Sequence, residues 1–386
     1  MNLIRFALPI IFSIVFFACG INEKLSNANI IHDSGLISQV MVENNQLFVK
    51  ATEDIHLRFE YYCRIDNKDK HLGWSVKGLD DVFNISIPCK YEDSQYYIKV
   101  RAENSNAFQD TVFYFYASPS NFSFLEMHFI DVEQGDATYI KTPENYSIII
   151  DGGYGTRGSS KLDWQGFGQP LALNYINSLG IDHFNYIIET HHHADHYGGL
   201  SDIKNSNTYT WDYELSNNNT YNYVVGQNLE LDSDVQFKIL NIGYPPGQSN
   251  SGINNTSIVL KVNYGYADFL LTGDAEGVVQ NYMMQNSMEL KADLFKISHH
   301  GSSSNGTCNT KFLNTVFNKD TKIGIISFGT NNPYGHPKAL YRFSDYYVFG
   351  TGTPPDQSPY QNHYFNCGNI ITYCDGQAII ISIDNN

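Results

Sequence analysis

The chain of 386 residues is short of positive charge: 24 Lys and Arg stand against 40 Asp and Glu, a formal net charge of −16. Most of the imbalance lies in residues 124–386, which contain 13 basic and 26 acidic residues. A surface of this sign repels nucleic-acid phosphates unless a bound metal or a local basic patch intervenes. The composition therefore counts against a processive grip on long DNA.

Long apolar runs are also scarce, and the one at the N-terminus is short for a membrane span. Residues 6–17 are mainly apolar and follow Arg5, whereas a transmembrane helix needs about 20 apolar residues. A basic start, an apolar middle and a small residue before Cys19 are the features of a secretory signal. We expect residues 1–19 to direct export and the polar residues 20–30 to form a linker.

The pair Ala18–Cys19 resembles the lipobox of bacterial lipoproteins. The resemblance implies cleavage before Cys19 and lipidation of this residue. The exported protein would then be anchored through lipid to a membrane of the bacterial cell envelope, in the periplasm or at the outer-membrane surface. A plain signal peptide with a chance cysteine is the alternative.

Cysteine is infrequent too, and none of the six occurs in a C-x-x-C motif. This spacing argues against a cysteine-based zinc site. In an oxidising compartment, Cys63–Cys89 and Cys367–Cys374 are candidate disulfides. Five cysteines remain after export, so at least one thiol would stay free or pair elsewhere.

Residues 31–118 show a pattern typical of short strands. Leu57, Phe59 and Tyr61 alternate with more polar neighbours, the period of two that a half-buried strand requires. Residues 95–117 indicate a hairpin around a polar turn. The region predicts a small all-β sandwich similar to immunoglobulin-like or fibronectin-type modules. Such a module would be a spacer or a docking unit for protein or glycan; the sequence does not indicate the oligomeric state.

Residues 122–384 mix strands with helical segments and predict an α/β body. Four apolar strands there end in ionisable residues. These ends are Asp151, the histidine cluster of residues 191–196, Asp274 and the pair His299–His300. Side chains at the ends of neighbouring strands converge on one rim of a sheet. We therefore expect these four segments to form one site.

The segment "ETHHHADHYGGL" (residues 189–200) holds four of the thirteen histidines. His191, His193, Asp195 and His196 form the pattern His-x-His-x-Asp-His. Imidazole nitrogen and carboxylate oxygen suit Zn²⁺, Mn²⁺ or Fe, and two such groups of ligands would place two ions about 3.5–4 Å apart. A polar loop without metal is the alternative.

With "IIIDGG", "LLTGD" and "SHHGS" in the same order, this cluster resembles the metallo-β-lactamase superfamily. More narrowly, the segments "FIDVEQGDATYI", "NNTSIVLKV", "DLFKISHHGSSSN" and "ISFGTNNPYGHP" resemble the hydrolase domain of ComEC-type competence proteins. The resemblance covers residues 124–384 and implies an αββα fold after the immunoglobulin-like sandwich.

The resemblance also implies a role for each site residue. His191 and His193 would bind the first divalent ion, Asp195 and His196 the second, and Asp274 both. His300, or alternatively its neighbour His299, would complete the second site, and Asp151 would support the ligands from behind.

Further contacts are expected from residues beside the ligands. Asp195, His299 and His336 would serve catalysis, and Asn255, Ser302 and Asn331 would contact substrate. A loop-stabilising role is the alternative for His336, and simple turn formation is the alternative for Ser302.

The chemistry implied is hydrolysis by a metal-activated water, with two Zn or Mn ions. A phosphodiesterase acting on nucleic acid or on a smaller phosphodiester is one reading. An esterase or lactonase, and a binding lipoprotein with a degenerate hydrolase body, are the others. No histidine occurs from Tyr197 to Gly273, where binuclear relatives have another ligand, so the first site would be open or partly occupied.

Overall fold

The computed structural model divides into two compact units, Met1–Asn121 and Phe122–Asn386. In the first unit it describes the backbone of the strands between residues 28 and 116. In the second it describes residues 124–384 except 157–167, 218–222, 250, 318–321, 331, 356–359, 361, 375 and 377–378. Residues 1–27, with Cys19, and the side chains of Cys63 and Cys89 lie outside the described parts.

The strands of the first unit form two antiparallel sheets of four strands each. One has the order β1-β2-β3-β6, with strands β1 (Ala28–Ile31), β2 (Ile37–Glu43), β3 (Gln46–Ala51) and β6 (Asp81–Asn84). The other has the order β5-β4-β7-β8, with strands β4 (His56–Ile65), β5 (Lys68–Lys77), β7 (Gln95–Glu103) and β8 (Phe108–Tyr116). β1 begins inside the segment predicted to be a linker, while the immunoglobulin-like sandwich stays a prediction.

The first sheet of the second unit has the order β13-β12-β11-β10-β9-β22-β23. Its strands are β9 (Leu125–Phe129), β10 (Thr138–Lys141), β11 (Ser147–Ile150), β12 (His183–Ile188), β13 (Thr210–Leu215), β22 (Asn369–Cys374) and β23 (Ile379–Asp384). The strands β11, β12 and β13 run parallel, and the other neighbours are antiparallel. The carboxyl ends of β11 and β12 therefore meet at one edge.

The second sheet has the order β14-β15-β16-β17-β18-β19-β20-β21. Its strands are β14 (Asn228–Leu229), β15 (Val235–Asn241), β16 (Val259–Tyr264), β17 (Ala267–Leu271), β18 (Leu294–Lys296), β19 (Ile323–Ile326), β20 (Tyr347–Gly350) and β21 (His363–Tyr364). From β17 onward the neighbours are parallel. β18 and β19 are fully buried, which suits apolar strands that are covered on both faces.

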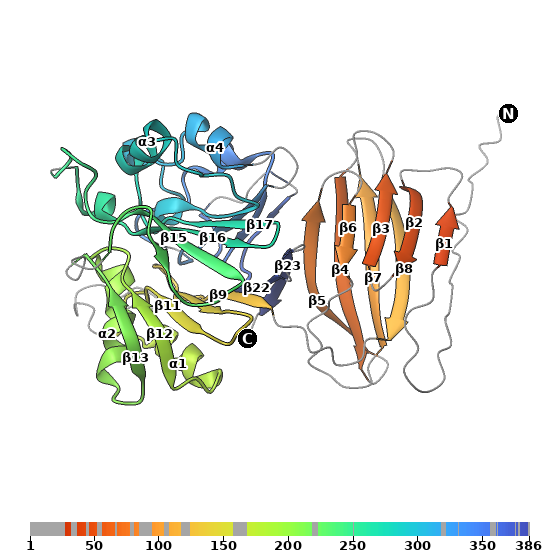
Figure 1. Cartoon of the computed structure of the whole chain (residues 1–386), viewed down its shortest axis with the longest axis horizontal. Helices are drawn as coiled ribbons and strands as arrows, with labels where there is room; N and C mark the ends of the chain where they lie inside the picture. Colours follow the sequence, from red (N-terminus) through yellow and green to blue (C-terminus); the bar gives the residue numbers. More distant parts are fainter. Residues whose placement is uncertain are drawn as a thin grey trace. The chain divides into compact units, whose positions relative to one another are not determined.

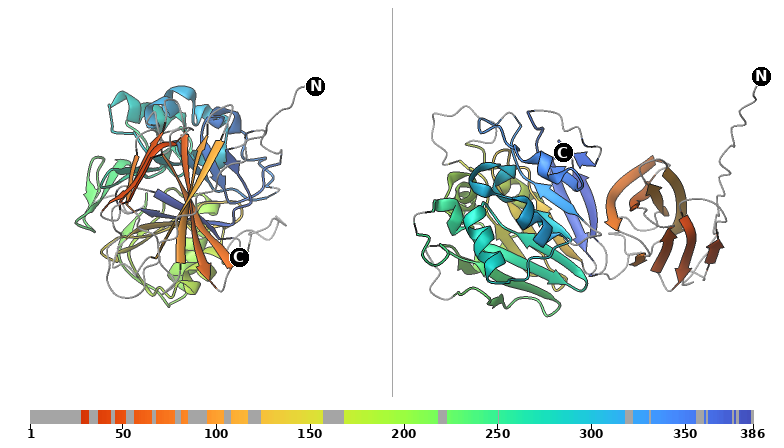
Figure 2. Two further views of the ribbon diagram at one scale, coloured as in Figure 1. Left: turned by 90° about the vertical axis from the view of Figure 1, so that its right-hand side faces the viewer. Right: turned by 90° about the horizontal axis from the view of Figure 1, so that it is seen from above.

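Helices cover the outer faces of both sheets (Figures 1 and 2). They are α1 (Leu171–Ser178), α2 (Ala194–Asn205), α3 (Gly277–Gln285) and α4 (Thr310–Val316), with 3₁₀ turns η1 (Ile253–Thr256), η2 (Ser298–Gly301), η3 (Ser304–Gly306) and η4 (Leu340–Phe343). In Figure 1, α1 and α2 lie beside β11–β13, and α3 and α4 lie above β15–β17. Ile150 and Leu271 from the two sheets line one small cavity. The second unit is thus a mixed α/β body in four layers, consistent with the expected αββα arrangement.

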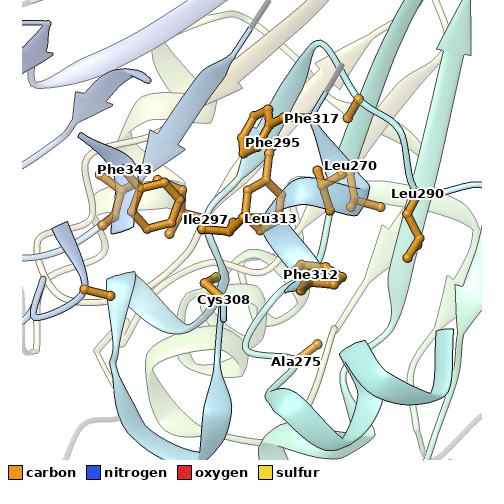
Figure 3. Close-up of a cluster of buried hydrophobic side chains, with 14 of the residues drawn as sticks. Leu270, Ala275, Leu290, Phe295, Ile297, Cys308, Phe312, Leu313, Phe317 and Phe343 are labelled. Carbon is orange, nitrogen blue, oxygen red and sulfur yellow. The ribbon is translucent and has the colours of Figure 1, made fainter. Parts of the chain in front are cut away.

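Two hydrophobic clusters hold these layers together. Between α3, α4 and the second sheet, Phe295, Phe312 and Leu313 are buried side by side (Figure 3). Between α1, α2 and the first sheet, Ile176 and Phe184 are buried in the same way. Each phenylalanine buried in full contributes about 1.5–3 kcal/mol, so the strand ends that carry the ionisable residues rest on rigid layers.

The predicted disulfide between Cys367 and Cys374 is wrong, because both residues are thiols in the structure. Cys374 is the last residue of β22, and its sulfur accepts a hydrogen bond from the Gly376 amide. Cys367 lies before the strand, and its thiol donates to the Tyr364 carbonyl. Pairing β22 with β9 and β23 keeps the two cysteines at opposite ends of an extended segment. Cys308 is a third buried thiol.

Candidate metal centre

The histidine cluster lies where β12 ends and α2 begins. Asp195 is in the first turn of α2, where the helix dipole favours a carboxylate. The turn fits only because two glycines follow: a Cβ at Gly199 would overlap the Gly152 carbonyl oxygen, and one at Gly198 would overlap that of Tyr154. The two glycines of the "HYGGL" segment therefore allow the ligand-bearing turn to pack closely against the end of β11.

Asp151, the residue after β11, ties the cluster together from below. Its Oδ1 accepts a hydrogen bond from the Thr190 amide (2.8 Å) and its Oδ2 one from the Thr190 hydroxyl (2.6 Å). The same Oδ2 lies 2.7 Å from His196 Nδ1. Because Nδ1 is engaged, His196 turns Nε2 toward Asp274, 3.3 Å from its Oδ1.

Asp274 follows β17 and lies at the centre of the site, 2% exposed. Its Oδ1 is 3.6 Å from His300 Nε2, and its Oδ2 is 3.8 Å from His191 Nε2 and 3.7 Å from His299 Nε2. Burial raises the pKa of Asp274, but the nearby His196, His300 and His299 outweigh it and hold this pKa well below its usual range. Asp274 is therefore a carboxylate at neutral pH.

His299 and His300 occupy η2, and both have left-handed backbone angles, with φ of 52° and 48°. Such angles are uncommon for residues other than glycine and cluster at functional sites. The turn separates the two rings. His300 is buried, with Nδ1 2.9 Å from the Ser327 carbonyl and Nε2 3.4 Å from Asp195. His299 is partly exposed, so of the two only His300 is enclosed among the other candidate ligands.

His191 and His193 lie on the other side of Asp274. Their rings contact through His191 Nε2 and His193 Nδ1, 3.0 Å apart. Burial lowers the pKa of both imidazoles, and so does the neighbouring His196. Both are therefore neutral at neutral pH, the form that binds a metal. His192, between them, is 53% exposed at its side chain and bonds Glu189 instead.

The structure therefore brings most of the predicted metal ligands together, whereas His193 belongs to none of the groups of close ligand atoms among the described residues. Ligand atoms of His191, His196 and Asp274 lie within 4.8 Å of one another, and so do those of Asp195, His196 and His300. His196 Nε2, His300 Nε2 and Asp274 Oδ1 are buried without a hydrogen-bond partner. Buried polar atoms normally have a partner, so these three atoms fit a site for divalent cations.

The predicted substrate contacts are placed differently. Asn255 is buried, and its amide group bonds the Ser251 carbonyl and both the backbone and the carboxylate of Glu276. Ser302 is buried and shares its hydroxyl with Ser304. Neither arrangement favours a substrate contact, because the polar atoms are already used inside the fold. Asn331 lies outside the described residues.

His336, the other predicted catalytic residue, does lie beside the site. It is 7% exposed, its ring centroid is 5.6 Å from that of His299, and its Nδ1 is buried without a hydrogen-bond partner. Burial, together with His300 and His299, lowers the pKa of His336 to about 3. Its imidazole is therefore neutral at neutral pH.

Three residues near the ligands were not assigned a role from the sequence. Asp136 and Lys296 form a buried ion pair of 2.7 Å under the site, and Asp136 Oδ1 is also 3.4 Å from His300 Nδ1. The Glu276 carboxylate accepts hydrogen bonds from Asn254, Asn255 and Asn305 and lies 3.4 Å from His299. Lys296 ends β18, Asp136 lies two residues before β10, and Glu276 is the N-cap of α3, so no common sequence pattern identifies the three.

Comparisons with known proteins agree with this geometry. Residues 130–306 match the model of the metallo-beta-lactamase superfamily. The chain is 26% identical over 236 residues to the ComE operon protein 3 of Bacillus subtilis strain 168. This match covers 55% of this chain and 29% of that protein. It is 28% identical over 166 residues to the competence protein ComA of Neisseria gonorrhoeae, covering 42% and 22%.

An uncharacterised protein of Escherichia coli K12, YcaI, is 27% identical over 222 residues, covering 56% of this chain and 27% of that protein. The chain thus spans less than a third of the length of these relatives. Residues 130–306 are thus similar to proteins of the metallo-beta-lactamase superfamily, and the chain is similar to competence proteins at low identity. None of the described helices has the length and apolar character that crossing a membrane requires.

Proposed function

We propose that the second unit is a metal-dependent phosphodiesterase. The observation that carries the proposal is the set of buried ligand atoms without hydrogen-bond partners, His196 Nε2, His300 Nε2 and Asp274 Oδ1. They belong to three segments far apart in the chain and face one another across 3.3–3.6 Å. Buried polar atoms normally have a hydrogen-bond partner, and a cation bound between these three atoms would supply one.

Two divalent cations, Zn or Mn, would be held by two groups of residues that share Asp274. His191 and His193 would hold the first, and Asp195, His196 and His300 the second. When bound, such ions lower the pKa of water to near neutrality and neutralise charge that develops on the reacting oxygen atoms. This chemistry needs no nucleophilic side chain.

The protein's own residues orient this centre. Asp151 accepts the Nδ1 proton of His196, and the Ser327 carbonyl accepts that of His300, so both Nε2 atoms are directed to Asp274. Partners of this kind fix the tautomer and the ring orientation of a ligating histidine. His336, whose ring is buried and uncharged, and His299, whose ring is partly exposed, flank the centre, which suits contacts with a substrate or its leaving group.

The similarity to competence proteins supports a phosphodiester as the substrate. The negative charge of residues 124–386 supports a small or short phosphodiester. An esterase or lactonase on the same scaffold is the second candidate, because the same centre can attack a carboxyl carbon. For the whole chain we propose export and lipid anchoring at Cys19, with the first unit as a spacer or a docking module.

Hydrolysis of bis(p-nitrophenyl) phosphate, a lactone and a β-lactam tests the proposal. The full chain is freed of metal with a chelator and supplied with Mn²⁺ or Zn²⁺. We expect metal-dependent turnover of the phosphodiester, reduced at least about 10²-fold in Asp274→Asn, because a preorganised charge is lost. Asp212→Asn, which alters an exposed carboxylate on β13, is the matched control and should keep the activity. Turnover of carboxyl esters alone would replace the proposal with the second candidate.

A further inference from the structure

The loop after β19 places an aromatic ring at the edge of the candidate metal centre. Tyr334 is 43% exposed, and its ring stacks on the His336 imidazole, with centroids 5.7 Å apart and planes inclined by 23°. The His336 ring is in turn 6.1 Å from that of His300. An exposed aromatic surface therefore begins only one ring away from a candidate ligand.

Tyr334 is held from the opposite sheet by Tyr154, which follows β11. The two hydroxyl oxygens are 3.3 Å apart, and Tyr154 is 7% exposed. Burial raises the pKa of Tyr154, and the carboxylates of Asp195 and Asp274 raise it further, so its hydroxyl stays protonated. With one end bonded and one face against His336, the Tyr334 ring loses little freedom when a ligand stacks on it.

The negative charge of the second unit limits which interactions, apart from those with bound cations, could bind a substrate. A net negative surface gives no electrostatic hold on a phosphate chain, whereas stacking on an aromatic ring needs no positive charge. Base–aromatic stacking tightens binding by about 5- to 150-fold per base. A rigid, half-exposed ring beside the centre is therefore suited to a substrate that carries a planar base next to its phosphate.

We infer that Tyr334 is the stacking platform for a planar base of the substrate. The inference rests on the proposed function for the position of the phosphate and adds the group that the protein selects. Tyr334 would be a specificity residue: it would contact the base, with no part in breaking the P–O bond, and Tyr154 would position it.

Binding of deoxyadenosine 5′-monophosphate and of base-free deoxyribose 5-phosphate to the full chain in Mn²⁺ tests the inference by calorimetry. We expect the nucleotide to bind at least about fivefold more tightly. Tyr334→Leu should bring this ratio close to one, while Tyr334→Phe, which keeps the ring, should retain it. Tyr266→Leu, which alters a tyrosine that is 86% exposed on the β16–β17 turn, is the matched control.

Tyr334→Trp supplies a second measurement if the leucine variant is unstable. It should keep the ratio, and its added fluorescence should be quenched by the nucleotide and not by deoxyribose 5-phosphate. A ratio near one in the unmodified chain, or a ratio that Tyr334→Leu leaves unchanged, would overturn the inference. Equally tight, Tyr334-dependent binding of glycerophosphocholine would overturn it too, because the ring would then serve a cation.

The two proposals fail in different ways. Hydrolysis of bis(p-nitrophenyl) phosphate without any preference for a base would keep the phosphodiesterase and remove the platform. Base-dependent binding that disappears in Tyr334→Leu, without hydrolysis of any phosphodiester, would keep the platform and remove the phosphodiesterase.

Discussion

The two candidate metal positions share Asp274 but are built differently. At the second position, His196 and His300 are both buried, and each has its Nδ1 engaged, by Asp151 and by the Ser327 carbonyl. At the first position only His191 is fully buried, and Nδ1 of the partly exposed His193 contacts the His191 ring itself. Asn255, in the stretch from Tyr197 to Gly273 that has no histidine, bonds Glu276.

The surrounding charges also differ between the two candidate metal positions. Burial lowers the pKa of His300, but Asp274, Asp136 and Asp195 outweigh it and raise this pKa to about 10. At His191 burial dominates and the pKa falls well below its usual range. A cation at the second position would displace the proton of His300 and would face two carboxylates, Asp195 and Asp274, whereas His191 and His193 at the first position share only Asp274. The comparison teaches that one ion should be held tightly and the other loosely.

Removing one ligand from each position tests this most directly. His300→Ala should abolish retention of the tight ion, so that metal content after dialysis falls toward zero. His193→Ala should leave about one ion bound, because the second position is intact. Metal analysis by mass spectrometry gives the result. Equal losses in both variants would mean that the two positions are equivalent.

The second largest effect is expected from substitution of the buried ion pair beneath the second position. Lys296 and Asp136 are 3% and 6% exposed at their side chains, and removing one partner leaves a buried charge, which costs about 3–5 kcal/mol. Lys296→Met should therefore lower the free energy of unfolding by this amount in urea denaturation. The control is Lys204→Met, from a partly exposed pair with Glu214, for which less than about 1 kcal/mol is expected. Similar losses of unfolding free energy in the two variants would show that the buried Asp136 carboxylate does not need Lys296 as its partner.

The proximity of the candidate ligands could be predicted from the sequence, while their role as ligands stays a prediction. His191, His193, Asp195 and His196 lie within six residues, and Asp151, Asp274 and His300 each follow a strand by one to four residues, so the strand pattern predicts that they lie at one rim. Asp136 and Lys296 escaped because an ion pair between residues 160 positions apart leaves no periodic signal. Cys367–Cys374 failed because short separation in sequence does not imply proximity when the second cysteine belongs to a paired strand.

Substitution of Asp151, which supports a candidate ligand, is expected to lower metal affinity less than substitution of a ligand. Asp151→Asn keeps the shape of the side chain but removes the charge that fixes His196, and such changes lower metal affinity about 10–100-fold. The second position should weaken more than the first, because Asp151 contacts His196 directly and reaches His191 only through the Thr190 hydroxyl, which is 3.2 Å from His191 Nδ1. Competition with a chromophoric chelator measures both affinities, with Asp212→Asn as the control. A loss confined to the first position would contradict the assignment of His196.

The smallest effect should come from the histidine in the middle of the cluster. His192 is 53% exposed, bonds Glu189 and stacks on Tyr197, with ring centroids 4.2 Å apart. It shares the sequence pattern of its neighbours but lies on the solvent side of the turn. His192→Ala should change metal content and turnover less than about twofold and stability by no more than about 1 kcal/mol, as is usual for exposed pairs. Loss of an ion in this variant would show that the turn presents a different pair of histidines to the metals.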